Sequence, residues 1–138
     1  MNQRVYLDHA ATTAVKKEVL EYMLPYFSEH YGNPSALYSL AGESQQVLSE
    51  ARKTIASAIH ARPEEIYFTA GGTESDNWAI KAAAEAYKKK GSHIITSKIE
   101  HHGVLHVCSY LEQQGVRVTY LDVDEKGLVD PKDVEAAI

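Results

Sequence analysis

The chain is short of cysteine, of long apolar runs and of excess positive charge, and each shortage narrows what it can be. One cysteine among 138 residues excludes an internal disulfide, so we expect a reducing cytoplasm. No apolar run approaches the length of a membrane span, and we expect no signal peptide before Asp8. Lysine and arginine number 14 against 19 acidic residues, a net charge of −5, which argues against nucleic-acid and membrane-surface partners.

What is present is an alternation of strand-like and helix-like patterns. Short β-branched and aromatic runs predict strands, and apolar residues at helical spacing predict the helices between them. Such alternation is typical of right-handed βαβ units, so we predict an α/β fold with a mostly parallel sheet and flanking helices. The predicted strands cover residues 5–7, 66–69, 93–99 and 116–121, and the predicted helices cover residues 15–27, 40–59, 74–87 and 104–114.

The pattern is clearest at residues 66–77, where a strand is followed by a Gly-Gly-Thr turn and a helix. The first N–H groups of such a helix point at open space, and the helix dipole adds partial positive charge there. With Gly72 giving close backbone approach and Thr73 adding a hydroxyl, this junction can hold a phosphate. The alternative is that Thr73 only caps the helix, with Asp76 completing a capping-box-like pair.

A second polar group follows the next strand, at Glu100, His101 and His102. Ligands of open α/β sheets bind beyond the carboxyl ends of the strands, so both junctions should face one rim. An imidazole at His101 can stack on a flat ring or act as acid or base. Together the two junctions suggest a phosphorylated ligand with a planar head.

Three other candidates are less specific. His102 and His106 stand four residues apart, as metal ligands on a helix often do, but nothing nearby completes a site and we predict no metal. Cys108 is expected to be a small buried apolar residue rather than a nucleophile. Lys98 lies close to the rim, but we expect it to face solvent rather than bind a cofactor covalently.

The chain resembles the cysteine desulfurases, pyridoxal-phosphate enzymes of the class V aminotransferase group, in five motifs that occur in the same order. These are YLDHAATT (6–13), YGNPS (31–35), AR (51–52), FTAGGTESDN (68–77) and EHHGV (100–104). The resemblance implies the first part of the aspartate-aminotransferase-like (fold type I) large domain. The sequence departs from the family pattern at Ala70, where a serine is common.

The resemblance also implies roles for particular residues. Gly72 and Thr73 would hold the phosphate of pyridoxal 5'-phosphate, and His101 would stack on its ring and move protons. Residues near the substrate would be His9, Ala10, Ala11 and Asn33. The substrate would be L-cysteine, and a sulfur-acceptor or scaffold protein and a homodimer of the complete enzyme are implied as partners.

The resemblance further implies a division of the chain and a missing part. Residues 1–14 would form a segment on the small-domain, substrate side, and residues 15–138 would begin the cofactor-binding large domain. The chain stops inside an expected helix opened by Asp130 and Pro131, so we expect a fragment of a longer protein. The family's cofactor-binding lysine and its catalytic loop cysteine have no counterpart here, so we expect the 138 residues alone to be inactive.

Three alternatives stay open, one of which is a phosphate-binding domain for some other ligand that binds phosphate without the absorption of bound pyridoxal phosphate. A parent protein without the loop cysteine would instead be another class V enzyme, such as a selenocysteine lyase or an aminotransferase. A stand-alone chain that stays colourless with pyridoxal phosphate would be a non-catalytic interaction module.

Overall fold

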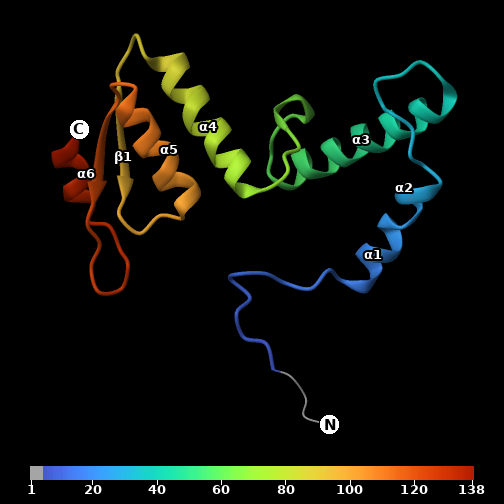
Figure 1. The fold of residues 1–138 in the computed structure, drawn as a ribbon, viewed down its shortest axis with the longest axis horizontal. Helices are drawn as coiled ribbons and strands as arrows, with labels where there is room; N and C mark the ends of the chain where they lie inside the picture. The colour runs from blue at the N-terminus through green and yellow to red at the C-terminus, as the bar shows by residue number, and fades with distance from the viewer. Residues whose placement is uncertain (1–4) are drawn as a thin grey trace. The chain divides into compact units, whose positions relative to one another are not determined.

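The computed structural model describes residues 5–138, which form two compact units divided between Tyr67 and Phe68. Figure 1 labels the elements of both units. The predicted division into residues 1–14 and 15–138 stays a prediction. Residues 1–4 of the first segment lie outside the described part of the chain.

The unit of residues 5–67 is helical. Its elements are α1 (Lys17–Met23), α2 (Pro25–Ser28), α3 (Ser39–Ala58) and the 3-10 turn η1 (Pro63–Glu65). Pro25 ends the first helical run and begins α2, as its missing N–H and fixed φ lead one to expect. The long α3 matches the predicted 40–59 helix, and Ala41 and Ala56 are its buried residues.

The unit of residues 68–138 is α/β. Its elements are α4 (Gly72–Tyr87), β1 (His93–Ser97), α5 (His102–Gln113), β2 (Arg117–Leu121) and α6 (Pro131–Ala137). The two strands pair in parallel, with His93 opposite Arg117 and Ser97 opposite Leu121. A parallel pair requires a crossover, and α5 provides it. The predicted α/β fold with parallel strands and flanking helices is confirmed.

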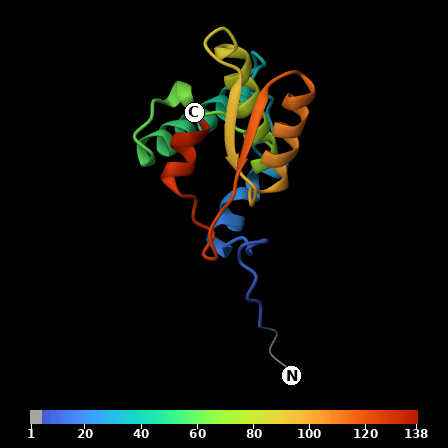
Figure 2. The same ribbon diagram turned by 90° about the vertical axis from the view of Figure 1, so that its left-hand side faces the viewer.

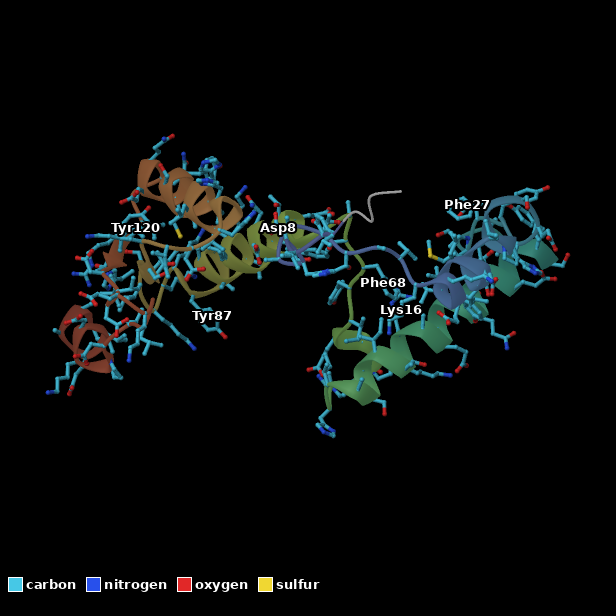
Figure 3. All side chains as sticks on the ribbon, turned by 90° about the horizontal axis from the view of Figure 1, so that it is seen from below. Asp8, Lys16, Phe27, Phe68, Tyr87 and Tyr120 are labelled. Carbon is cyan, nitrogen blue, oxygen red and sulfur yellow. The ribbon has the colours of Figure 1, made fainter. Side chains whose placement is uncertain are left out.

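The core of this unit lies under α5. Val107, Cys108 and Leu111 are buried on its inner face, and Leu121 is buried on β2. The helix packs against α4 and against β2, and α6 lies on the other side of the strands (Figure 2). Tyr120 lies on β2 (Figure 3), and its hydroxyl donates a hydrogen bond to Glu112 of α5 at 2.9 Å.

Two predicted strands are absent from the described residues. Neither residues 5–7 nor residues 66–69 form a β-ladder with another described segment, and Tyr67 is 66% exposed. A strand is completed by hydrogen bonds to a neighbour, and no described segment pairs with either run. Composition alone therefore predicted too many strands. Within residues 5–138, no helix has the length and apolar character needed to cross a membrane.

Candidate active site

The first turn of α4 carries backbone N–H groups that have no acceptor within the helix. Gly71 is the residue before the helix, and no side chain caps it. The first helical hydrogen bond runs from the Ser75 N–H to the Gly71 carbonyl at 3.1 Å, so the N–H groups of Gly72 and Thr73 precede it. The Thr73 hydroxyl makes no hydrogen bond to any described residue. Backbone donors and a hydroxyl thus share one end of the helix dipole.

The capping alternative for Thr73 is wrong. Thr73 is the second residue of the helix rather than its cap, and the carboxylate that turns back belongs to Glu74. Glu74 Oε2 accepts a hydrogen bond from the Ala70 N–H at 2.6 Å. That bond engages the acid nearest the turn, and a hollow remains that is lined by Ala70, Gly71, Gly72, Thr73, Glu74 and Asn77.

His101 is the residue before α5, and its side chain caps that helix. Its Nδ1 accepts a hydrogen bond from the Gly103 N–H at 3.0 Å. An acceptor nitrogen bears no proton, so the proton of the neutral ring is on Nε2. The side chain is exposed while its orientation is fixed by the cap. A fixed, exposed ring is suited to stacking on a flat ligand.

The two junctions meet at Gly103, which is buried. An ideal Cβ on Gly103 would lie 3.1 Å from His101 Nδ1 and 3.3 Å from Thr73 Oγ1. The Thr73 hydroxyl and the His101 imidazole therefore lie on the same side of the unit, a few ångströms apart. Their joint placement is what a ligand with a charged tail and a flat face requires.

Asn77 joins the same two helices and was not among the predicted site residues. Its Nδ2 donates hydrogen bonds to the Thr73 carbonyl at 3.0 Å and to the Gly103 carbonyl at 3.3 Å. The available signal was spacing, because a residue four positions after Thr73 lies on the same face of a helix.

The residues predicted on the substrate side belong to the other unit. His9 is exposed and makes an edge contact with the Tyr6 ring, 5.3 Å between centroids. The Asp8 carbonyl accepts a hydrogen bond from the Ala11 N–H at 3.1 Å, which forms a turn over Ala10. Asn33 Oδ1 accepts from the Ser35 N–H at 3.0 Å. These local turns leave the substrate role of His9, Ala10, Ala11 and Asn33 a prediction.

The remaining candidates fall outside the Thr73–His101 site. Cys108 is fully buried, and burial, then Glu112 and Glu100, raise the pKa of its thiol, so it stays protonated at neutral pH. Lys98 is exposed and bonds Asp122 Oδ1 at 2.6 Å. The rings of His102 and His106 stack at 5.5 Å, and no group of three or more metal-ligand side chains occurs in residues 5–138.

Comparison with known proteins places these observations in a family. A family model described as aminotransferase class-V matches residues 5–138. Cysteine desulfurase IscS of Clostridium botulinum (strain Hall) is 54% identical over 138 residues, 100% of this chain and 35% of that protein. The chain thus spans about a third of the length of such relatives.

Solved structures agree with this match. A NifS-like protein superimposes with a TM-score of 0.93 at 39% identity, over 99% of this chain and 37% of that chain. A structure of SspA in complex with cysteine gives 0.89 at 44% identity, over 96% and 38%. The predicted resemblance and the predicted fold type are confirmed. The chain belongs to the aminotransferase class-V family.

Proposed function

We propose that the complete protein is a pyridoxal-phosphate-dependent cysteine desulfurase. The observation that carries the proposal is that the Thr73 hydroxyl and the His101 imidazole both lie next to the Cβ position of Gly103, on the same side of the unit. The family and the names of the relatives support it, since they are cysteine desulfurases. The cysteine bound in the SspA structure supports the choice of substrate.

The donors at the start of α4 fit the phosphate of the cofactor. The N–H groups of Gly72 and Thr73 and the Thr73 hydroxyl would bind its oxygens, with the helix dipole in support. The Glu74 carboxylate lines the same hollow, and its Oε2 is held toward the Ala70 N–H by a hydrogen bond. The Ala70 side chain adds no hydroxyl, so Thr73 supplies the hydroxyl among the residues that line the hollow.

His101 fits the flat face of the cofactor. Its ring would stack on the pyridine, and its Nε2–H would be free to donate a hydrogen bond. A proton can be added at Nδ1 only when the Gly103 N–H is released, so proton transfer by His101 requires the cap of α5 to open. We therefore assign stacking as the resting role of His101 and proton transfer as a role of the uncapped ring.

The cofactor supplies an electron sink that weakens bonds in the bound amino acid. A protein thiol would attack the sulfur of L-cysteine, so that an S–S bond forms and the C–S bond of cysteine breaks. Cysteine and one thiol then become alanine and one persulfide. Cys108 is not that thiol, because it is buried and its pKa is raised. Sulfur would then pass to an acceptor or scaffold protein for iron–sulfur cluster or tRNA-thiolation pathways.

The remaining parts of the proposal concern the rest of the enzyme. His9, Ala10, Ala11 and Asn33 would lie on the substrate side, with residues 1–14 forming a separate segment from the 15–138 part of the large domain. The complete enzyme would be a cytoplasmic homodimer. The 138 residues alone would be inactive.

The test is the intact mass and visible spectrum of the protein from its native source, followed by an assay with L-cysteine. We expect a yellow protein, heavier than 138 residues account for, that releases alanine and forms a persulfide. Cys108→Ala should leave this activity in place. A yellow protein that releases sulfur from no cysteine but acts on selenocysteine, or transfers an amino group, contradicts the desulfurase proposal. A colourless protein of 138 residues would be a non-catalytic module.

A further inference from the structure

One side-chain amide links the two halves of the candidate site. Asn77 is half-buried on α4, and its Nδ2 donates to two carbonyls, that of Thr73 at 3.0 Å and that of Gly103 at 3.3 Å. The first bond lies within α4, and the second crosses to the first turn of α5. Asn77 thus provides a side-chain hydrogen bond between these two helices.

The crossing bond ends at the residue that orients His101. The Gly103 N–H donates to His101 Nδ1 at 3.0 Å, while the Gly103 carbonyl accepts from Asn77. The second acceptor of Asn77 is the carbonyl of Thr73, and the Thr73 hydroxyl lies 3.3 Å from the position of an ideal Cβ on Gly103. Thr73, Asn77, Gly103 and His101 therefore form one continuous chain of contacts.

From this geometry we propose that Asn77 is a positioning residue that sets the separation of the Thr73 hydroxyl and the His101 ring. The inference rests on the proposed function, because it concerns how the cofactor-binding residues are held. A ligand that is bound at both ends is held tightly only when the distance between the two binding groups is fixed. Asn77 would hold that spacing through its hydrogen bonds to the Thr73 and Gly103 carbonyls.

The chemistry of the amide explains why asparagine suits this place. Both acceptors are carbonyl oxygens, so the linking group must present two N–H donors, which a single amide nitrogen does. A carboxylate of the same shape has no donor and would face two partial negative charges. Asn77→Asp therefore removes the link while keeping the volume, and Asn77→Gln keeps the donors on a longer side chain.

The experiment measures pyridoxal phosphate binding by the complete protein and its Asn77 variants. The readouts are the dissociation constant and the circular dichroism of the bound chromophore, which reports how firmly the ring is oriented. We expect Asn77→Ala and Asn77→Asp to bind about tenfold more weakly, the free energy of about one hydrogen bond, with reduced chromophore dichroism. Asn77→Gln should recover part of both signals.

A control and the unfolding midpoint separate positioning from stability. The control is Glu85→Ala. Glu85 lies on the same helix and pairs with Lys88, and its loss should leave the dissociation constant and the chromophore dichroism unchanged. Denaturant unfolding of each variant identifies any that does not fold, and the other two substitutions then decide the matter. Weaker folding with an unchanged chromophore signal in all three variants would show a structural role and overturn the inference.

Two further outcomes are distinguishable. A yellow unsubstituted protein whose Asn77 variants bind and orient the cofactor equally well overturns the positioning role and leaves the proposed function intact. An unsubstituted protein that binds no pyridoxal phosphate overturns the proposed function and this inference with it.

Discussion

The two units of the chain differ in how they bury their side chains. In the 68–138 unit, Val107 and Cys108 are 1% and 0% exposed, and Leu111 and Leu121 are 7% and 9% exposed. In the described part of the 5–67 unit, the buried apolar residues are only the alanines Ala41 and Ala56. Many larger apolar side chains there are exposed, among them Leu7, Val15, Tyr22, Phe27, Leu37 and Ile59. Helical periodicity is therefore not enough to make a core.

This difference bears on the site. Thr73, Asn77 and His101 stand on helices of the unit that has a core, and their hydrogen bonds fix them to each other. Packed supports hold functional groups to within the tolerance that binding needs. The 5–67 unit supplies local turns at Asp8 and Asn33 but no buried large side chain beneath them. The residues proposed to bind the cofactor thus stand on a packed core, which the local turns at Asp8 and Asn33 lack.

The largest expected effect comes from a matched pair of leucine substitutions. Leu111→Ala should lower the free energy of unfolding by about 3 kcal/mol, because it removes a buried side chain and leaves a cavity. Leu37→Ala removes a fully exposed side chain in the other unit, and its effect should stay within about 0.5 kcal/mol. Urea unfolding followed by circular dichroism measures both. Equal effects would contradict the difference between the units.

The second prediction concerns Gly32 in the 5–67 unit, where the backbone leaves no room for a side chain. An added Cβ on Gly32 would lie 2.3 Å from the Leu40 carbonyl oxygen, a backbone atom that cannot move freely. Gly32→Ala should therefore destabilise the protein by about 2 kcal/mol, as overpacking does. The control is Gly42→Ala in α3, where nothing lies within 4 Å, and which should stabilise by up to about 1 kcal/mol. Thermal unfolding compares them, and a neutral Gly32→Ala would show that even this point is loosely packed.

Local pattern predicted the elements that local interactions determine. The spacing of apolar residues predicted α3 and α5, and the Asp130–Pro131 start of α6 is a hydrogen-bonded cap, with Asp130 Oδ1 accepting from the Lys132 N–H at 2.9 Å. The strands at residues 5–7 and 66–69 were wrong, because pairing depends on a distant neighbour that composition does not specify. The parallel pairing of β1 and β2 followed from the length of the helix between them.

The site shows the same limit. The rule that ligand-binding loops share one sheet edge predicted that the Thr73 and His101 junctions would face each other, and the structure brings both to Gly103. The cap of α4 was not predictable in the same way, since Gly71 and Glu74 took the places expected for Thr73 and Asp76. The contact from Asn77 to Gly103 joins residues 26 positions apart, and no local pattern reports it. The roles of these residues in binding stay predictions.

The smallest expected effect is at the Tyr120–Glu112 hydrogen bond, which joins β2 to α5. Tyr120→Phe removes a hydroxyl that donates to Glu112 Oε2 at 2.9 Å and should cost about 1 kcal/mol at neutral pH. Tyr110→Phe is the control, because the Tyr110 ring keeps its contact with Lys81 and the tyrosine is 49% exposed. Urea unfolding should detect a loss for the first substitution and none for the second.

The same tyrosine also sets a pH dependence at alkaline pH. Burial, followed by the bond to Glu112 and the charge of that carboxylate, raises the pKa of Tyr120 to about 12, from 10.0 in the absence of these contacts. Between these values the unfolded chain releases the proton that the folded chain keeps, so this contribution to stability is complete below about pH 10 and is lost as pH rises towards 12. The Tyr120→Phe protein should lack that part of the alkaline decline, and the Tyr110→Phe protein should keep it. If both variants lose stability as steeply as the unsubstituted protein between these pH values, the bond from β2 to α5 contributes nothing to the core of the 68–138 unit.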